Sequence, residues 1–126
     1  MRKSSTDPFP LPEYGGPAVY SLIDENGKKY IGSTVNLRRR LKAHASSIRL
    51  VQRKGMDAFI SDAMADAVRA GHTFRWSVLE TFPADIPDGI LRLAELRHIE
   101  KAGGIDSLYN GTKRVKFRDP LPKGEL

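Results

Sequence analysis

The most unusual side chains of this sequence lie at the border of the apolar face of an expected helix. Residues 37–51 repeat apolar side chains at helical spacing, and Arg40 and His44 stand one turn apart beside that stripe. A guanidinium, which is always charged, and an imidazole, which titrates near neutral pH, would project together at the rim of the core. Each also has an ordinary explanation, because an arginine can extend its charged head into water and a histidine can simply occupy a boundary position.

A second expected helix, residues 88–101, carries a carboxylate in the same kind of position. Glu95 lies between apolar side chains one turn before it and one turn after it. An ionised carboxylate there is costly unless it has a cation or hydrogen-bond donors. The ordinary explanation is an ion pair with Arg92 or His98. The functional explanation is a hard cation such as Mg²⁺, which prefers oxygen ligands.

Two tyrosines, Tyr20 and Tyr30, stand in the two expected strands of a β-hairpin whose turn contains an Asn-Gly pair. The length of the turn decides whether they meet, because side chains alternate between the two faces of a strand. A two-residue turn, 26–27, places them on opposite faces. A three-residue loop with Gly27 in the left-handed region pairs Leu22 with Tyr30 and puts both tyrosines on one face. The sequence permits both registers, and strand tyrosines more often serve as packing residues.

The elements that must position these residues follow from the same patterns, with Asn36 as the N-cap of the first helix. Their β-β-α-α-β-α order predicts a small α+β domain, an antiparallel three-stranded sheet flanked by helices. We expect a flexible arm at residues 1–16, one domain at 17–111 and a basic tail at 112–126, partly disordered unless a partner binds it. The expected strands are 18–23, 30–33 and 74–82, and the expected helices are 37–51, 57–70 and 88–101.

Composition limits the classes of function. The 126 residues fit one domain, and the absence of cysteine excludes disulfides, thiolate zinc sites and cysteine nucleophiles. No apolar run follows the N-terminal charges as in a signal peptide, and no stretch has the roughly 20 apolar residues of a membrane span. We therefore expect a protein that is intracellular, cytoplasmic or nucleoid-associated, and not secreted. A net charge of +6 and a pI near 9.8 indicate attraction to phosphate backbones.

Taken together, these residues resemble the GIY-YIG nuclease family. The first signature strand corresponds to Ala18-Val19-Tyr20 and the second to Tyr30-Ile31-Gly32-Ser33. The resemblance covers residues 17–110. Ala18 departs from it where the family has a glycine, and we expect little effect because alanine fits an ordinary strand position. The family's helix arginine, a histidine one turn later, its metal-binding glutamate and its late asparagine correspond to Arg40, His44, Glu95 and Asn110.

The resemblance implies a metal-dependent endonuclease, of a homing, phage or repair type, that hydrolyses phosphodiester bonds in nucleic acid, with DNA as the first expectation. It implies that Glu95 holds one Mg²⁺ (or Mn²⁺) ion and that Arg40 donates to phosphate oxygens. Tyr20 is implied as the general base toward water, which requires positive charge nearby because a free tyrosine has a pKa near 10. The sequence leaves open which residue takes the proton. The other residues implied as catalytic, which position water, share the proton transfer or order the site, are Tyr30, His44 and Asn110.

Nucleic-acid binding would depend on basic side chains that contact phosphates. We find no zinc site, helix-turn-helix or other sequence-reading module beside the domain. We therefore expect low intrinsic sequence specificity, a targeting protein or dimer partner, or a chain limited to the catalytic part. The candidate contacts are Lys29, which lies beside Tyr30 and could also supply some of the positive field that Tyr20 needs, and Arg38, Arg39, Lys42, Arg49, Arg53, Lys54, Lys113, Arg114 and Lys116.

The alternative is a catalytically silent nucleic-acid-binding module of the same fold. The complete set of site residues argues against it. An unrelated basic domain would require the match to be a coincidence.

Overall fold

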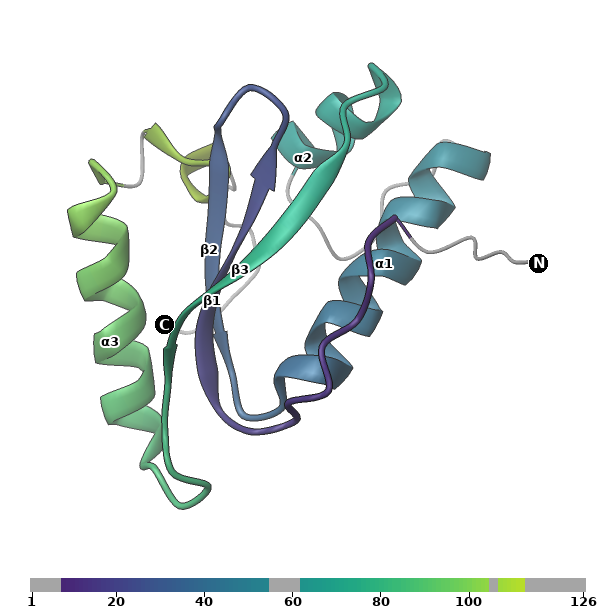
Figure 1. Cartoon of the computed structure of the whole chain (residues 1–126). Coiled ribbons are helices and arrows are strands. Elements are labelled where there is room, and N and C mark those ends of the chain that lie inside the picture. The colour runs from purple at the N-terminus through teal and green to yellow at the C-terminus, as the bar shows by residue number, and fades with distance from the viewer. Residues whose placement is uncertain (1–7, 55–61, 105–106, 113–126) are drawn as a thin grey trace, which may run out of the picture.

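The computed structural model describes residues 8–54, 62–104 and 107–112, and its elements follow the expected β-β-α-α-β-α order (Figure 1). The strands β1 (Ala18–Asp24), β2 (Lys29–Thr34) and β3 (Phe74–Thr81) form an antiparallel sheet in the order β2-β1-β3. The helices are α1 (Leu37–Lys54), α2 (Asp62–Arg69) and α3 (Asp88–Lys101), and the short 3-10 helix η2 (Tyr109–Thr112) follows. The α+β fold class with this element order is confirmed.

The hairpin between β1 and β2 has the three-residue loop. Leu22 pairs with Tyr30 and Tyr20 pairs with Gly32, so the register is the one that the longer loop requires. Gly27 has a φ of 90°, a left-handed conformation that glycine adopts without steric cost. Because side chains two residues apart in a strand share a face, Tyr20 and Tyr30 lie on the same side of the sheet.

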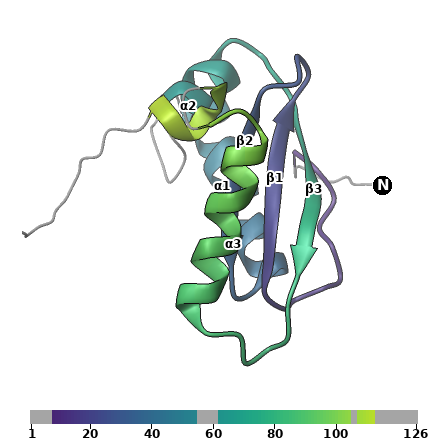
Figure 2. The same cartoon turned by 90° about the vertical axis from the view of Figure 1, so that its left-hand side faces the viewer.

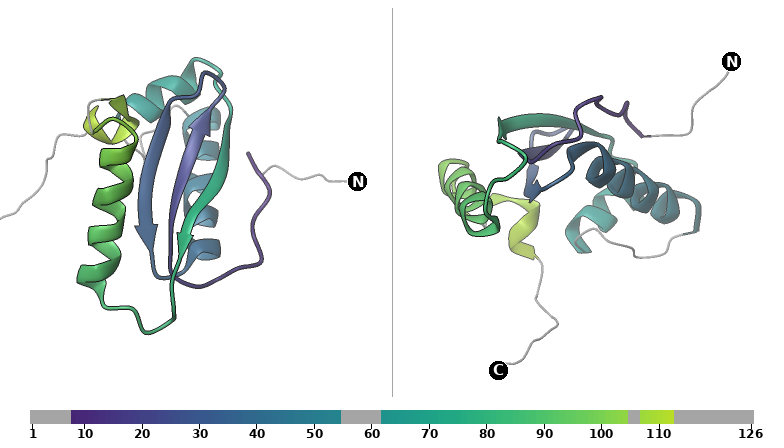
Figure 3. Two further views of the ribbon diagram at one scale, coloured as in Figure 1. Left: turned by 60° about the vertical axis from the view of Figure 1, so that its left-hand side comes forward. Right: turned by 90° about the horizontal axis from the view of Figure 1, so that it is seen from below.

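Two helical layers cover the two faces of the sheet (Figures 2 and 3). One face packs against α1 and α2, and the other packs against α3. Successive residues of a strand point to opposite sides of the sheet, so neighbouring residues of β1 belong to different clusters. The first cluster includes Tyr20, Leu22, Leu37, Leu41, Ile48 and Met64, and the second includes Val19, Ile31, Leu91, Ala94 and Ile99.

Helix α1, which carries Arg40 and His44, begins and packs as its sequence predicts. The Asn36 side chain accepts a hydrogen bond from the backbone N–H of Arg39 at 3.0 Å, which is an N-cap. The four apolar stripe residues 37, 41, 45 and 48 are at most 1% exposed. Helix α2 ends before Gly71, which has a φ of 94°. The first residues of the helix expected at 57–70 lie outside the described part of the chain.

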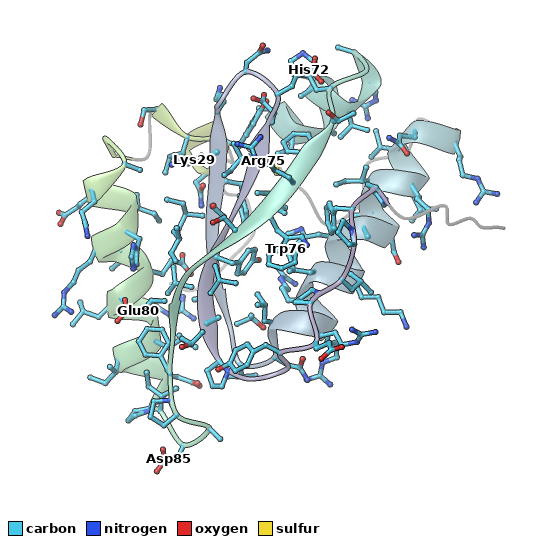
Figure 4. All side chains as sticks on the ribbon, viewed as in Figure 1. Lys29, His72, Arg75, Trp76, Glu80 and Asp85 are labelled. Carbon is cyan, nitrogen blue, oxygen red and sulfur yellow. The ribbon has the colours of Figure 1, made fainter. Side chains whose placement is uncertain are left out.

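Residues 9–12 of the N-terminal segment contact the domain, whereas flexibility was expected of residues 1–16. Phe9 is 5% exposed and belongs to the cluster under α1. The indole N–H of Trp76, on β3, donates to the carbonyl of Pro10 at 2.5 Å (Figure 4). Proline and glycine exclude regular secondary structure there, but they do not prevent an aromatic side chain from entering the core. Residues 1–7 and the expected tail from Lys113 lie outside the described residues, and no described helix is long and apolar enough to cross a membrane.

Candidate active site

A buried tyrosine and histidine form the centre of the site. The hydroxyl of Tyr20, on β1, lies 2.7 Å from Nε2 of His44, on α1. Tyr20 is 0% exposed and His44 is 3% exposed. Burial, and after it the positive charge of Arg40, lowers the pKa of His44 to about 3. The imidazole is therefore neutral at neutral pH and can accept the proton that the Tyr20 hydroxyl donates.

The second tyrosine completes an aromatic cluster at this point. The ring of Tyr30 lies 6.4 Å from the ring of Tyr20 and 5.5 Å from that of His44, measured between centroids. Burial raises the pKa of both tyrosines, and the neighbouring Tyr30 raises that of Tyr20 further. The charge of Arg40 opposes both shifts. Both phenols are therefore protonated at neutral pH.

Arg40, on α1 one turn before His44, interacts with the hydroxyl groups of both tyrosines. Interactions with the hydroxyls of Tyr20 and Tyr30 raise the pKa of Arg40, although burial alone would lower it. The guanidinium is therefore a permanent charge, and the residue keeps part of its surface exposed. It is the positive group of the cluster that an incoming anion can reach.

Gly32 makes room for the first tyrosine. A Cβ atom on Gly32 would lie 2.7 Å from the hydroxyl oxygen of Tyr20, 2.9 Å from its Cζ atom and 3.1 Å from Cε2 of Tyr30. The two distances to Tyr20 are shorter than a real Cβ contact allows, and the distance to Tyr30 is tighter than most such contacts. The Tyr20 hydroxyl thus lies directly over the backbone of β2, which forms one edge of the sheet.

Glu95 contacts β2 from the opposite face of the sheet. Its Oε1 atom accepts a hydrogen bond from Oγ of Ser33, the residue after Gly32, at 2.5 Å. Ser33 pairs with Val19 and so faces α3, whereas Tyr20 faces α1. The carboxylate still acts across the strand, because its charge raises the pKa of Tyr20 and of Tyr30. The candidate site therefore has two halves, one on each side of β2.

The carboxylate of Glu95 fits one hard divalent cation. A carboxylate is an oxygen ligand of the kind that Mg²⁺ prefers, and Mg²⁺ is commonly held by one or two carboxylates with water and substrate phosphates. Among the described residues, no basic side chain forms an ion pair with Glu95, and His98 instead pairs with Glu80 at 3.0 Å. The same residues contain no group of three or more His, Cys, Asp or Glu that could hold a metal by protein ligands alone.

Asn110, on η2, holds the backbone of β2 beside the site. Its Oδ1 accepts from the N–H of Ile31 at 2.9 Å, and its Nδ2 donates to the carbonyl of Ile31 at 2.7 Å. The side chain thus replaces a neighbouring strand at the outer edge of β2. Because Ile31 lies between Tyr30 and Gly32, this clamp fixes the strand that carries both halves of the site.

Asp24 is a polar residue that sequence reasoning did not single out. It is 2% exposed and accepts a hydrogen bond from the hydroxyl of Tyr109, the residue before Asn110. It also accepts from the backbone N–H groups of Asn26 and Lys28 at 2.8 and 3.0 Å. These donors hold the pKa of Asp24 below its ordinary value although burial alone would raise it. The available signal was an aspartate at the end of a buried strand, directly before an Asn-Gly loop.

Three of the basic residues expected to bind nucleic acid lie on a different side of α1 from Arg40. At 100° per residue, Lys42, Arg49 and Arg53 lie about 180–220° around α1 from Arg40. A pocket of about 300 Å³ on that outer side is lined by Ser46, Arg49, Leu50 and Arg53. The Arg38 guanidinium donates to the carbonyl of Pro12 at 2.7 Å, Arg39 is exposed, and Lys29 lies at the hairpin end of β2 (Figure 4). The Lys54 side chain, Lys113, Arg114 and Lys116 lie outside the described residues.

Comparison with known families agrees with this geometry. Residues 16–84 match the sequence model of the GIY-YIG catalytic domain, a segment that includes both tyrosines, Arg40 and His44. Glu95 and Asn110 lie C-terminal to the match, so the structure alone brings them to β2. No curated protein and no solved structure matches this chain. A GIY-YIG catalytic domain implies nuclease-type phosphodiester hydrolysis of nucleic acid, typically with a divalent metal. Because the match covers more than half of the chain, the protein belongs to the GIY-YIG family.

Proposed function

We propose that this protein is a metal-dependent endonuclease that hydrolyses phosphodiester bonds in DNA. The single observation that carries the proposal is the convergence at β2 of three kinds of group. These are a hydrogen-bonded tyrosine and histidine, a charged and partly exposed arginine, and a glutamate without a basic partner among the described residues. Phosphodiester hydrolysis needs an activated water, a stabilised phosphate and help for the leaving oxygen.

Arg40 binds the scissile phosphate in this proposal. Its planar guanidinium can donate two parallel hydrogen bonds to phosphate oxygens, and its charge does not depend on pH near neutrality. When the guanidinium turns toward the phosphate, it weakens its interactions with Tyr20 and Tyr30. Because Tyr20 is fully buried and its hydroxyl interacts with Arg40, this movement of the guanidinium opens a path for the attacking water to the hydroxyl.

Tyr20 and His44 move the proton of the attacking water. The oxygen of Tyr20 accepts a proton from water while the hydroxyl proton passes to Nε2 of His44, 2.7 Å away. The transfer leaves a neutral tyrosine and an imidazolium, so no tyrosinate has to exist beforehand. The charge of Arg40 disfavours this imidazolium, and the negative phosphate offsets that effect once substrate is bound.

Glu95 holds the divalent cation, Mg²⁺ or Mn²⁺. When bound, this ion polarises the scissile phosphate and stabilises the departing 3′ oxygen. Tyr30 orients Tyr20 and the water through its ring and hydroxyl, and Asn110 keeps β2 in place by its two bonds to Ile31. Proton transfer thus takes place on one side of β2, and the cation binds on the other side.

A cleavage assay on supercoiled plasmid, with and without Mg²⁺ or Mn²⁺, tests the proposal. The wild type is compared with Glu95→Gln and Arg40→Ala, and with Glu100→Gln as the matched control, since Glu100 is an exposed glutamate of the same helix. We expect nicked or linear product that requires metal, that is lost in both site variants and that persists in the control.

Two other outcomes would change the assignment. Salt-sensitive plasmid binding without cleavage would favour the catalytically silent binding module, and cleavage of structured RNA alone would move the substrate from DNA to RNA. Cleavage that persists in Glu95→Gln would contradict the role of this residue.

A further inference from the structure

The hydrogen bond between Ser33 and Glu95 links the end of β2 to α3. The Oγ atom of Ser33 donates to Oε1 of Glu95 at 2.5 Å, and both residues are partly exposed. We propose that Ser33 is a positioning residue that holds one oxygen of Glu95 so that the other oxygen faces the cation. This inference rests on the proposed function, since it assigns the cation to Glu95.

The glutamate needs such a partner because its helix fixes only its backbone. Helix α3 is anchored to the sheet by the buried residues Leu91, Ala94 and Ile99. The side chain of Glu95 has three rotatable bonds beyond that anchor, and it loses their freedom when it binds an ion. Ser33 has a short side chain on a paired strand, so its hydroxyl occupies a position that the sheet determines.

The chemical type of the donor matters as much as its position. A serine hydroxyl is neutral, and it orients the carboxylate without cancelling its charge. A lysine or arginine in this place would form an ion pair and compete with a cation for the same oxygens. The pair of Ser33 and Glu95 therefore suits a carboxylate that must remain an anionic ligand.

The position of Ser33 also sets the distance between the two halves of the site. Gly32 and Ser33 are consecutive residues of one strand and point to opposite faces. The first accommodates the Tyr20 hydroxyl and the second contacts Glu95. The two halves of the site, the proton-transfer half and the cation half, are therefore separated by one peptide unit of β2.

A purely structural tether between β2 and α3 is the competing explanation. The helix is already attached by its apolar face and by the pair of His98 with Glu80. If Ser33 served only as a tether, removing its hydroxyl would change thermal stability and leave the affinity for the cation unchanged. A positioning role predicts that the affinity for the cation falls when the hydroxyl is removed.

The experiment measures Mn²⁺ binding to the full chain by electron paramagnetic resonance, without nucleic acid, and in parallel the Mg²⁺ dependence of cleavage. Ser33→Thr and Ser33→Val have the same shape and differ only in the hydroxyl, so they form the decisive pair, and Ser33→Ala supports them. Ser77→Ala is the control, because Ser77 lies on β3 and faces the same side of the sheet. Glu95→Gln reports whether the ion binds at the glutamate at all.

We expect Ser33→Val and Ser33→Ala to weaken Mn²⁺ binding by about 10-fold or more, as loss of a hydrogen bond to a metal ligand does elsewhere. Higher Mg²⁺ should restore most of their cleavage, and Ser33→Thr and Ser77→Ala should resemble the wild type. Equal Mn²⁺ affinity in Ser33→Thr and Ser33→Val, with Glu95→Gln impaired, would overturn this inference and leave the proposed function intact. Unchanged Mn²⁺ binding in Glu95→Gln would overturn both.

Discussion

Replacing Gly32 by alanine should separate catalysis from folding in this protein. The added Cβ would lie 2.7 Å from the hydroxyl oxygen of Tyr20 and 2.9 Å from its Cζ atom. Carbon atoms in contact are normally about 3.5–4.0 Å apart, so the tyrosine ring or the strand must shift by roughly 1 Å. Tyr20 is 0% exposed and its hydroxyl lies 2.7 Å from Nε2 of His44, so a shift of the ring displaces the hydroxyl from His44.

The magnitude follows from this shift. Overpacking a core typically costs about 1–3 kcal/mol in the free energy of unfolding, which should lower the melting temperature by several degrees. A reacting group misplaced by about 1 Å can lose roughly 100-fold in rate. Gly32→Ala should therefore remain folded and cleave plasmid about 100-fold more slowly under single-turnover conditions.

Gly89→Ala provides the matched control. Gly89 lies in the first turn of α3 without a positive φ, and a Cβ there meets nothing within 4 Å. This substitution should leave cleavage unchanged and could stabilise the helix by up to about 0.5–1 kcal/mol. If Gly32→Ala unfolds and cleaves like Gly89→Ala, the steric argument is refuted. Tyr20→Phe removes the closest atom, so the double variant with Gly32→Ala should be more stable than the sum of the two changes predicts.

Two further predictions concern the residues on either side of this strand. Between its ordinary pKa of 6.5 and its folded value of about 3, His44 is protonated only in the unfolded chain, so acidification through this range lowers the free energy of unfolding, by up to about 1.4 kcal/mol per pH unit. In His44→Gln, the free energies of unfolding by urea at about pH 6 and about pH 4 should be more similar than in the wild type. An unchanged dependence of this free energy on pH would show that His44 is not the group that titrates. Asn110→Ala leaves the N–H and carbonyl of Ile31 without their partner, which should cost about 1–3 kcal/mol and slow cleavage. Asn110→Asp keeps the acceptor for the N–H of Ile31 and should lose less stability than Asn110→Ala. If both variants were as stable as the wild type, the two bonds of Asn110 to Ile31 would not hold β2.

The order of the elements could be predicted from the sequence because each element depends on a local pattern. The stripe of apolar residues on α1 fixes its buried face, and Asn36 fixes its first turn. The hairpin was predictable only as a choice between two registers. The conformation of Gly27 decides between them, and that conformation depends on how the two strands twist together.

The contacts that complete the site could not be predicted in the same way. Ser33 and Glu95 are 62 residues apart in sequence, and Asp24 and Tyr109 are 85 residues apart. Such pairs depend on how α3 and η2 dock on the sheet, and no local periodicity encodes that docking. Phe9 is a similar case, since proline and glycine around it indicate an irregular backbone and say nothing about where its ring packs.

The use of an edge strand explains why this small fold can hold such a site. A central strand has neighbours on both sides, and groups on its two faces are separated by the sheet. At the edge of a sheet, groups from both faces can approach the same open side. On the edge strand β2, the hydroxyl of Tyr20 lies over Gly32 on one face, and Glu95 contacts Ser33 on the other. An open edge also exposes unpaired backbone groups that invite association with other chains. Asn110 occupies the N–H and carbonyl of Ile31 with a side chain, which protects that position of the edge without adding a strand that would cover the site.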